Sequence, residues 1–136
     1  MEVQTAETHP IAETEDIVLA RQAVRQAALK LGFNLVDQTK IVTATSELAR
    51  NTLVYGGGGR MVLEVVQNGR FPGIRLTFED QGPGIANIEQ AMKDGFTSGH
   101  GMGLGLGGAK RLCDEFEIES APGKGTRIVI LRWRKV

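Results

Sequence analysis

Hydrophobic residues in the first part of the chain recur with the period of an amphipathic helix. Between residues 15 and 31 they fall on one helical face, and Gly32 follows as a helix stop. A second helical pattern begins at about Asp37, whose side chain suits an N-cap, and runs to Tyr55, where a glycine run ends it. The pattern therefore predicts two consecutive helices, preceded by residues 1–13 as a tail or an edge strand.

The next part of the chain changes to the alternation of apolar and polar residues that is typical of strands. Segments 61–66 and 74–78 alternate in this way, and residues 68–73 between them are expected to form a turn. Segments 116–120 and 126–133 form a second such pair around a tight, glycine-containing turn. Each pair is expected to form an antiparallel hairpin.

Two short helices are expected between the two strand pairs, at residues 87–93 and 104–113. The order is then two helices followed by hairpins that a helix interrupts. This order favours an α+β two-layer sandwich over an alternating parallel α/β sheet. Residues 1–136 are expected to form one domain, because a chain of this length suits one hydrophobic core.

The composition excludes several classes of protein. Sixteen basic residues balance sixteen acidic ones, so no large net field attracts nucleic acid or an anionic membrane. The basic run 132–135 is expected to be a solvated strand end. The single cysteine, Cys113, lies in an apolar stretch and is expected to be a buried structural thiol in a reducing compartment. No membrane span or signal peptide is apparent, so a cytoplasmic location is expected.

The most specific pattern is a run of alternating glycines at residues 99–108, directly before a predicted helix. Each glycine costs a helix about 1 kcal/mol relative to alanine, so such a run makes a poor core element. Its free N–H groups at a helix start suit a phosphate. Segment 103–108 matches G-x-G-x-x-G, but no strand precedes it and no Gly-Lys-Ser/Thr ending occurs, so neither a Rossmann nor a Walker site is expected.

Three shorter segments carry side chains that suit nucleotide chemistry. Glu47 and Asn51 lie four apart on a predicted helix and share one face, where they could serve as a general base and a metal ligand, or simply be exposed. Asp80 ends an apolar strand and enters a Gly-Pro-Gly turn, which fits an ordinary turn or a carboxylate beside a flat ligand. Residues 123–126 by themselves indicate only a hairpin turn.

Together, these four segments resemble in order and spacing the motifs of the GHKL (Bergerat-fold) ATPases and kinases, the superfamily of gyrase, Hsp90, MutL and histidine kinases. Residues 47–51 look like its N box, 80–84 like its first glycine box, 101–106 like its second and 123–126 like its last. The resemblance covers roughly residues 14–133. It implies the Bergerat ATP-binding fold, with a mixed, mostly antiparallel sheet and helices on one face.

Within that superfamily, the short chain resembles the anti-sigma-factor serine/threonine kinases, and most of all the RsbT-type switch kinases of the stressosome. Its second glycine box is more regular than is typical of that type and is closer to the histidine-kinase form. The stretches that carry the resemblance are 37–38, 46–51, 79–85, 94–96, 110–112, 114–116 and 118–120.

The resemblance also implies a role for each motif residue. Asp80 would accept a hydrogen bond from the adenine amino group, and Thr126 would assist through a bridging water. Asn51 would hold Mg²⁺, and Glu47 would orient or deprotonate the attacking hydroxyl. Residues 96–101 would form a lid over the nucleotide. The expected nucleotide-binding residues are Asn51, Asp80, Gly82, Gly84, Gly99, Gly101, Met102, Gly103, Leu104, Gly105, Leu106 and Thr126.

The function that the resemblance implies is an ATP- and Mg²⁺-dependent protein kinase that phosphorylates STAS-domain proteins on serine or threonine and activates a PP2C-type phosphatase by binding. Two alternatives stay open. One is a related kinase that binds a sigma factor directly, and the other is a nucleotide-responsive interaction module without catalysis, against which Glu47 argues. Neither nucleic acid nor membrane is expected as a partner. Lys110 either reaches a phosphate or stays solvated.

Overall fold

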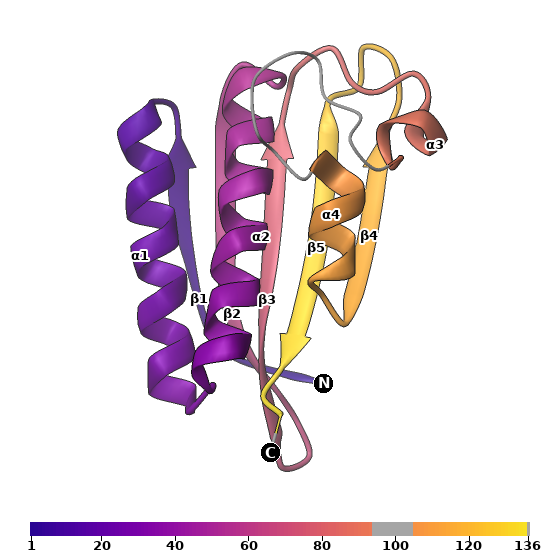
Figure 1. Cartoon of the computed structure of the whole chain (residues 1–136). Helices are drawn as coiled ribbons and strands as arrows, with labels where there is room; N and C mark the ends of the chain where they lie inside the picture. The colour runs from indigo at the N-terminus through magenta and orange to yellow at the C-terminus, as the bar shows by residue number, and fades with distance from the viewer. Residues whose placement is uncertain (94–104, 136) are drawn as a thin grey trace.

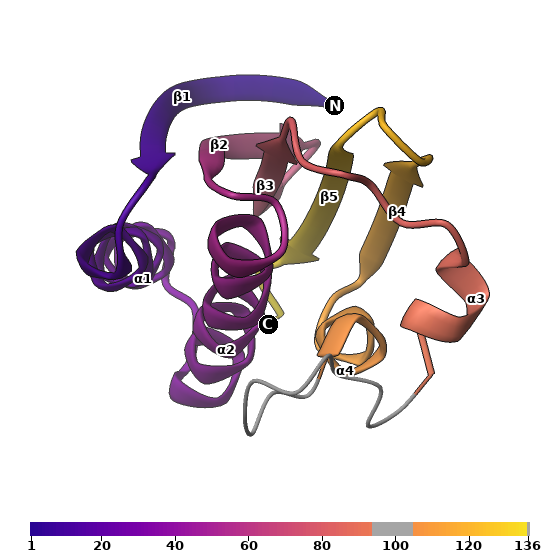
Figure 2. The ribbon, with the colours of Figure 1, turned by 90° about the horizontal axis from the view of Figure 1, so that it is seen from above.

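The computed structural model describes residues 1–93 and 105–135 and has one sheet with helices over one of its faces (Figure 1). Seen from above, α1, α2 and α4 lie on the same side of the strands, which confirms the α+β sandwich (Figure 2). Along the chain the elements are β1 (Glu2–Ile11), α1 (Thr14–Leu31), α2 (Leu35–Val54), β2 (Gly59–Asn68), β3 (Phe71–Asp80), α3 (Ile88–Ala91), α4 (Gly105–Arg111), β4 (Glu115–Ser120) and β5 (Thr126–Trp133).

The strands lie in the order β1-β2-β3-β5-β4, and every pairing in the described ranges is antiparallel. The sheet is therefore more regular than the mixed sheet that was expected. Within the first thirteen residues, Glu2–Ile11 form an edge strand and not a tail, because β1 pairs with β2 along nearly its whole length. The turn predicted at 68–73 is shorter, since Asn68 already pairs with Phe71 and only Gly69 and Arg70 turn the chain. Gly69 takes a left-handed φ of 61°, as a tight turn requires.

The two long helices begin and end for local reasons. Gly32 closes α1 in the left-handed conformation with φ 85°, as its sequence position predicted. The N-cap of α2 is Asn34, not Asp37, because the Asn34 side chain accepts a hydrogen bond of 2.8 Å from the backbone N–H of Asp37. The helix therefore starts earlier than predicted. Its first two residues, Leu35 and Val36, are exposed and apolar, so they break the amphipathic pattern at that end.

The core lies between the helices and the inner face of the sheet. Its largest buried side chains alternate along the strands and follow the helical period on α2, as the two periods require. Burying one such aliphatic or aromatic side chain contributes roughly 1.5–3 kcal/mol. The largest fully buried core side chains are Ile11, Val24, Ile41, Leu48, Met61, Ile74, Leu76, Phe78 and Ile130.

The basic C-terminal run is only partly solvated, which corrects the prediction. Arg132 is 7% exposed and its guanidinium pairs with the Asp37 carboxylate, which is 5% exposed. It also donates a hydrogen bond of 2.8 Å to the Leu112 carbonyl. The reason is alternation: Arg132 shares the inner side of β5 with Ile128 and Ile130, so it must point toward the helices.

Cys113 is half-buried at the end of α4, with its Sγ 3.2 Å from the Ala109 carbonyl oxygen. Burial raises the pKa of its thiol to about 12, so it stays protonated at neutral pH. This fits the structural role that was expected.

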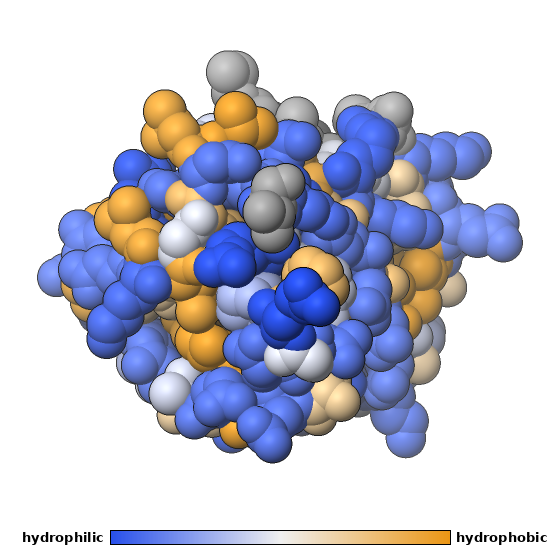
Figure 3. Space-filling model, turned by 90° about the horizontal axis from the view of Figure 1, so that it is seen from below, coloured by the Kyte–Doolittle hydropathy of each residue, from blue (hydrophilic) through white to orange (hydrophobic). Residues whose placement is uncertain are grey.

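The end of the molecule where both termini lie carries mixed surface chemistry. Figure 3 views this end and shows hydrophobic groups interrupted by hydrophilic ones, without one continuous apolar face. The exposed apolar residues on its helices and turn are Leu29, Leu35, Val36 and Phe71. Among the helices that the structure describes, none is long and apolar enough to cross a membrane.

Candidate nucleotide-binding site

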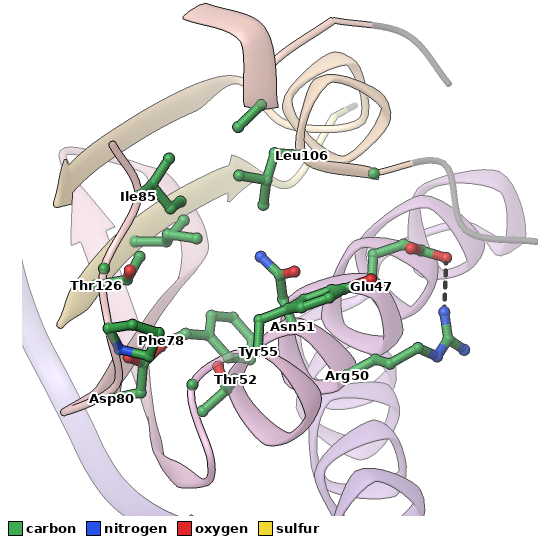
Figure 4. A pocket seen from close by; sticks show the side chains of 16 residues that line it. Glu47, Arg50, Asn51, Thr52, Tyr55, Phe78, Asp80, Ile85, Leu106 and Thr126 are labelled. Carbon is green, nitrogen blue, oxygen red and sulfur yellow. Dashed lines mark hydrogen bonds and ion pairs between the residues drawn. The ribbon is translucent and has the colours of Figure 1, made fainter. Parts of the chain in front are cut away.

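A cavity of about 310 Å³ lies at the other end of the sheet, between the C-terminal half of α2, the C-terminal end of β3, the start of β5 and the start of α4 (Figure 4). It is lined by Glu47, Arg50, Asn51, Thr52, Tyr55, Gly56, Phe78, Asp80, Pro83, Gly84, Ile85, Ala91, Gly105, Leu106, Thr126 and Ile128.

The cavity brings together residues from all four sequence motifs. The predicted residues that line it are Glu47, Asn51, Asp80, Gly84, Gly105, Leu106 and Thr126. Gly82 lies beside it and is not part of the lining. The expected lid, 96–101, and Gly99, Gly101, Met102, Gly103 and Leu104 fall outside the described residues. Lys110 is exposed on α4 and does not line the cavity.

Helix α2 supplies the polar groups of one end of the cavity. Glu47 and Asn51 are one turn apart, and Asn51 points into the cavity (Figure 4). The Glu47 side chain is 15% exposed and forms an ion pair of 3.2 Å with Arg50, which is 41% exposed. This end therefore holds a carboxylate, a carboxamide and a guanidinium within two turns of one helix.

Sequence reasoning missed Arg50 and Tyr55 as cavity residues. Arg50 lies three residues after Glu47 inside the same motif, and that spacing was a usable signal for a side-chain contact. Tyr55, the C-cap of α2, was recognised only as the helix end, and its place at the cavity had no signal in the local pattern.

The sheet supplies the polar groups of the opposite end. Asp80 ends β3, and Thr126 begins β5 directly opposite it in the antiparallel register. One Asp80 oxygen, Oδ1, accepts a hydrogen bond of 2.9 Å from the Gly82 N–H, which fixes the carboxylate at the entrance to the turn. The register explains why two residues far apart in the sequence reach the same point.

Glycines around Asp80 are required by close packing of the backbone. A Cβ atom on Gly56 would collide with the Asp80 carboxylate, and one on Gly82 would collide with the backbone of Gly56. Gly84 has a left-handed φ of 78°, and a side chain there would meet the Ala121 carbonyl. The absent side chain of Gly82 thus makes room for the backbone of Gly56, which lines the cavity beside Asp80.

Apolar side chains separate the two polar ends. Phe78 and Ile128 extend the core to the cavity floor, while Ile85 and Leu106 face it from the surrounding loop and helix (Figure 4). Such a cavity can hold a flat, partly apolar group between its walls, with the Asp80 and Thr126 oxygens at one end and the α2 polar groups at the other. This division matches a ligand with a heteroaromatic ring and a charged tail.

Comparison with known proteins places these features in a family. Residues 36–135 match the model described as histidine kinase-, DNA gyrase B-, and HSP90-like ATPase. The serine/threonine-protein kinase RsbT of Bacillus subtilis is 49% identical over 118 residues, which cover 87% of this chain and 89% of that protein. The anti-sigma F factor of Clostridium acetobutylicum is 31% identical over 129 residues, which cover 88% of this chain and 87% of that protein.

Solved structures show the same fold at low sequence identity. The structure of the RsbU and RsbW domains of Rv1364c from Mycobacterium tuberculosis has a TM-score of 0.66 and 18% identity, covering 98% of this chain and 34% of that one. The mycobacterial sensor histidine kinase MprB has a TM-score of 0.56 and 23% identity, covering 95% of this chain and 97% of that one. These likenesses support the fold alone.

Proposed function

Because this chain belongs to the histidine kinase-, DNA gyrase B- and HSP90-like ATPases and, within them, to the serine/threonine-protein kinases, we propose that its cavity binds Mg²⁺-ATP for transfer of the γ-phosphate to a STAS-domain partner. The observation that carries the proposal is the convergence of Glu47, Asn51, Asp80 and Thr126 on one cavity. The adenine ring would lie between the apolar walls, and the phosphates would extend toward α2.

At the base end, the Asp80 carboxylate would accept a hydrogen bond from the adenine amino group. Its position supports this role, because one oxygen is held by the Gly82 N–H and the residue opens onto the cavity. A carboxylate has acceptors but no donor, so it favours a purine with an amino group at position 6 over one with a carbonyl there. Thr126 would assist from the neighbouring strand.

At the phosphate end, the Asn51 side-chain oxygen would hold Mg²⁺. No cluster of three or more His, Cys, Asp or Glu suited to a metal occurs in ranges 1–93 and 105–135, so the protein there offers no complete metal cage. Mg²⁺ commonly binds through one or two protein ligands and the phosphates, which fits Asn51 at this position. When bound, the ion would neutralise the charge that develops on the phosphates. Gly105, with its left-handed φ of 70°, and the preceding glycines would approach the phosphates through backbone N–H groups.

Glu47 would orient the acceptor hydroxyl and take its proton. The hydroxyl oxygen would bond to the γ-phosphorus, the bond from that phosphorus to the β–γ bridging oxygen would break, and ADP would leave. Arg50 pairs with the Glu47 carboxylate and so limits the directions that it can take. Positioning and charge stabilisation supply most of the rate in such transfers.

Two kinds of relative suggest a partner for the kinase. Similarity to RsbT supports a STAS-domain substrate and activation of a PP2C-type phosphatase by binding, as in partner-switching pathways. Similarity to anti-sigma F factors supports the alternative of a kinase that also binds a sigma factor. The identity is higher to the first, and we therefore favour the STAS substrate.

The kinase proposal predicts that the purified protein, given Mg²⁺ and labelled ATP, transfers label to a STAS-domain protein. The STAS protein to use is one whose gene lies beside the gene of this chain, and the label should appear on a serine or threonine. Labelling should fail with Asn51→Ala, because the metal ligand is lost, and persist with the exposed-residue control Glu117→Ala. Binding of a sigma factor without any labelled STAS protein would favour the antagonist. A partner whose binding responds to ATP without being labelled would favour the non-catalytic module.

A second prediction tests the adenine contact. Asp80→Ala should weaken ATP binding by about 1.5–3 kcal/mol, the usual value of a hydrogen bond to a charged group. Asp80→Asn is the sharper variant, because its carbonyl oxygen can still accept from Gly82 while its amide places a donor where ATP also donates. Calorimetry measures both, with Glu79→Ala on the outer face as the control. Equal affinities of the wild-type protein for ATP and GTP would remove Asp80 from the base site.

A further inference from the structure

Ser120, the last residue of β4, is half-buried and joins three segments beside the cavity without lining it. Its Oγ accepts a hydrogen bond of 2.8 Å from the Ile85 N–H and donates one of 2.8 Å to the Gly125 carbonyl. It also lies 2.8 Å from Oγ1 of Thr126, which does line the cavity. These contacts determine the direction of the hydrogen bond between the two hydroxyls.

A hydroxyl group has one proton and two acceptor lone pairs. The Gly125 carbonyl cannot donate, so the Ser120 proton is committed to it. Ser120 therefore accepts from both remaining partners, which means that Thr126 donates its own proton to Ser120. With that proton used, Oγ1 of Thr126 can offer the cavity only lone pairs.

Asp80 lies opposite Thr126 in the register, and its carboxylate is also an acceptor (Figure 4). We propose that Ser120 is a positioning residue for nucleotide choice: by taking the Thr126 proton, it makes the base end of the cavity accept from the ligand and so favours a 6-aminopurine over a 6-oxopurine. The inference rests on the proposed binding of ATP with its base at this end. Adenine offers two N–H protons at position 6, whereas hypoxanthine and guanine offer a carbonyl oxygen there.

The arrangement also explains the use of a serine at this place in the hairpin. Removing the Ser120 hydroxyl would free the Thr126 proton, which could then be donated directly or through a water to a 6-carbonyl. A purely structural serine would behave differently, because loosening the loop at Ile85 and the turn at Gly125 weakens every purine nucleotide alike. The ratio of affinities for ATP and ITP separates the two cases, since these nucleotides differ at the base edge.

The experiment measures the affinities of the full chain for ATP and ITP by calorimetry with the wild-type protein and Ser120→Ala. The ratio in favour of ATP should fall about 3- to 10-fold in the variant, the value of one ordinary hydrogen bond. The Thr126→Val variant lacks the hydroxyl whose hydrogen bond Ser120 directs. The double variant Thr126→Val/Ser120→Ala should therefore have the same ratio of ATP to ITP affinity as Thr126→Val alone. Ser120→Cys, a weaker acceptor of similar size, should shift the ratio in the same direction and serves if Ser120→Ala does not fold.

An equal loss of ATP and ITP affinity in Ser120→Ala and Ser120→Cys would overturn the inference and leave the proposed function intact. The same fall in ratio on the Thr126→Val background would overturn it too, because Thr126 would then not carry the effect. A wild-type protein that binds neither nucleotide would overturn the proposed function together with the inference.

Discussion

Replacing Glu47 by alanine is expected to slow phosphate transfer by roughly 100- to 10,000-fold, the usual contribution of a general base, while ATP affinity stays close to that of the wild type. The reason is position: Glu47 projects from α2 at the opposite end of the cavity from Asp80 and Thr126, where we propose that adenine binds, so its removal is not expected to affect contacts with adenine. Single-turnover labelling of the partner measures the transfer rate, and calorimetry measures the affinity for ATP.

Two variants make this test specific. Glu47→Gln keeps the size of the side chain and an oxygen that can face Arg50 but cannot accept the proton, so it should be slow as well. Glu117→Ala removes an exposed carboxylate from β4 and should transfer phosphate at the wild-type rate. Transfer by Glu47→Ala at a rate near that of the wild type would show that another group receives the proton.

Local features of the sequence were sufficient to predict most of the secondary structure. Gly32 and the glycines after Tyr55 mark the helix ends, because left-handed or extended backbone there suits glycine. The alternation in 74–78 and 126–133 identifies strands because one side of each lies against the helices. Asn34 was missed as the N-cap of α2 because the two exposed apolar residues that follow it resemble a loop in the hydrophobic pattern.

The candidate site was predictable as a set of residue types but not as a geometry. Motif order indicated that Glu47, Asn51, Asp80 and Thr126 act together, and the structure brings all four to one cavity. The direct opposition of Asp80 and Thr126 depends on the register of β3 and β5, which no local pattern fixes. Ser120 lies outside the four nucleotide motifs and had no signal for a role at the site, because the role that we propose for it depends on three partners that the fold supplies.

The sequence also could not distinguish a buried charge from a surface charge. Arg132 stands in a basic run, which usually indicates solvated residues, and its partner Asp37 lies far away in the sequence. Only the position of Arg132 on the inner side of β5 brings the two together, at the end of α2 that is distant from the cavity. This pair leads to the largest stability effect that we expect.

Asp37→Ala is expected to lower the free energy of unfolding by about 3–5 kcal/mol, because it leaves the Arg132 guanidinium buried without its ion-pair partner. That is a large part of the roughly 5–15 kcal/mol that stabilises a typical domain. Urea unfolding measures the change. Replacing both partners, with Asp37→Leu and Arg132→Met, should restore much of the loss, since apolar groups of similar size often replace a buried pair at little cost. The restoration is incomplete because the Leu112 carbonyl loses its donor.

The exposed pair of Arg60 and Glu79 provides the matched comparison, with an N–O distance of 2.9 Å on the surface of the sheet. Glu79→Ala should cost less than about 1 kcal/mol, because solvent screens such a pair. A loss in Asp37→Ala no larger than that in Glu79→Ala would show that Arg132 finds another partner or reaches solvent. Because Asp37 lies more than two helical turns from Glu47 on α2, folded Asp37→Ala protein should still bind ATP with wild-type affinity, so the defect would be confined to stability.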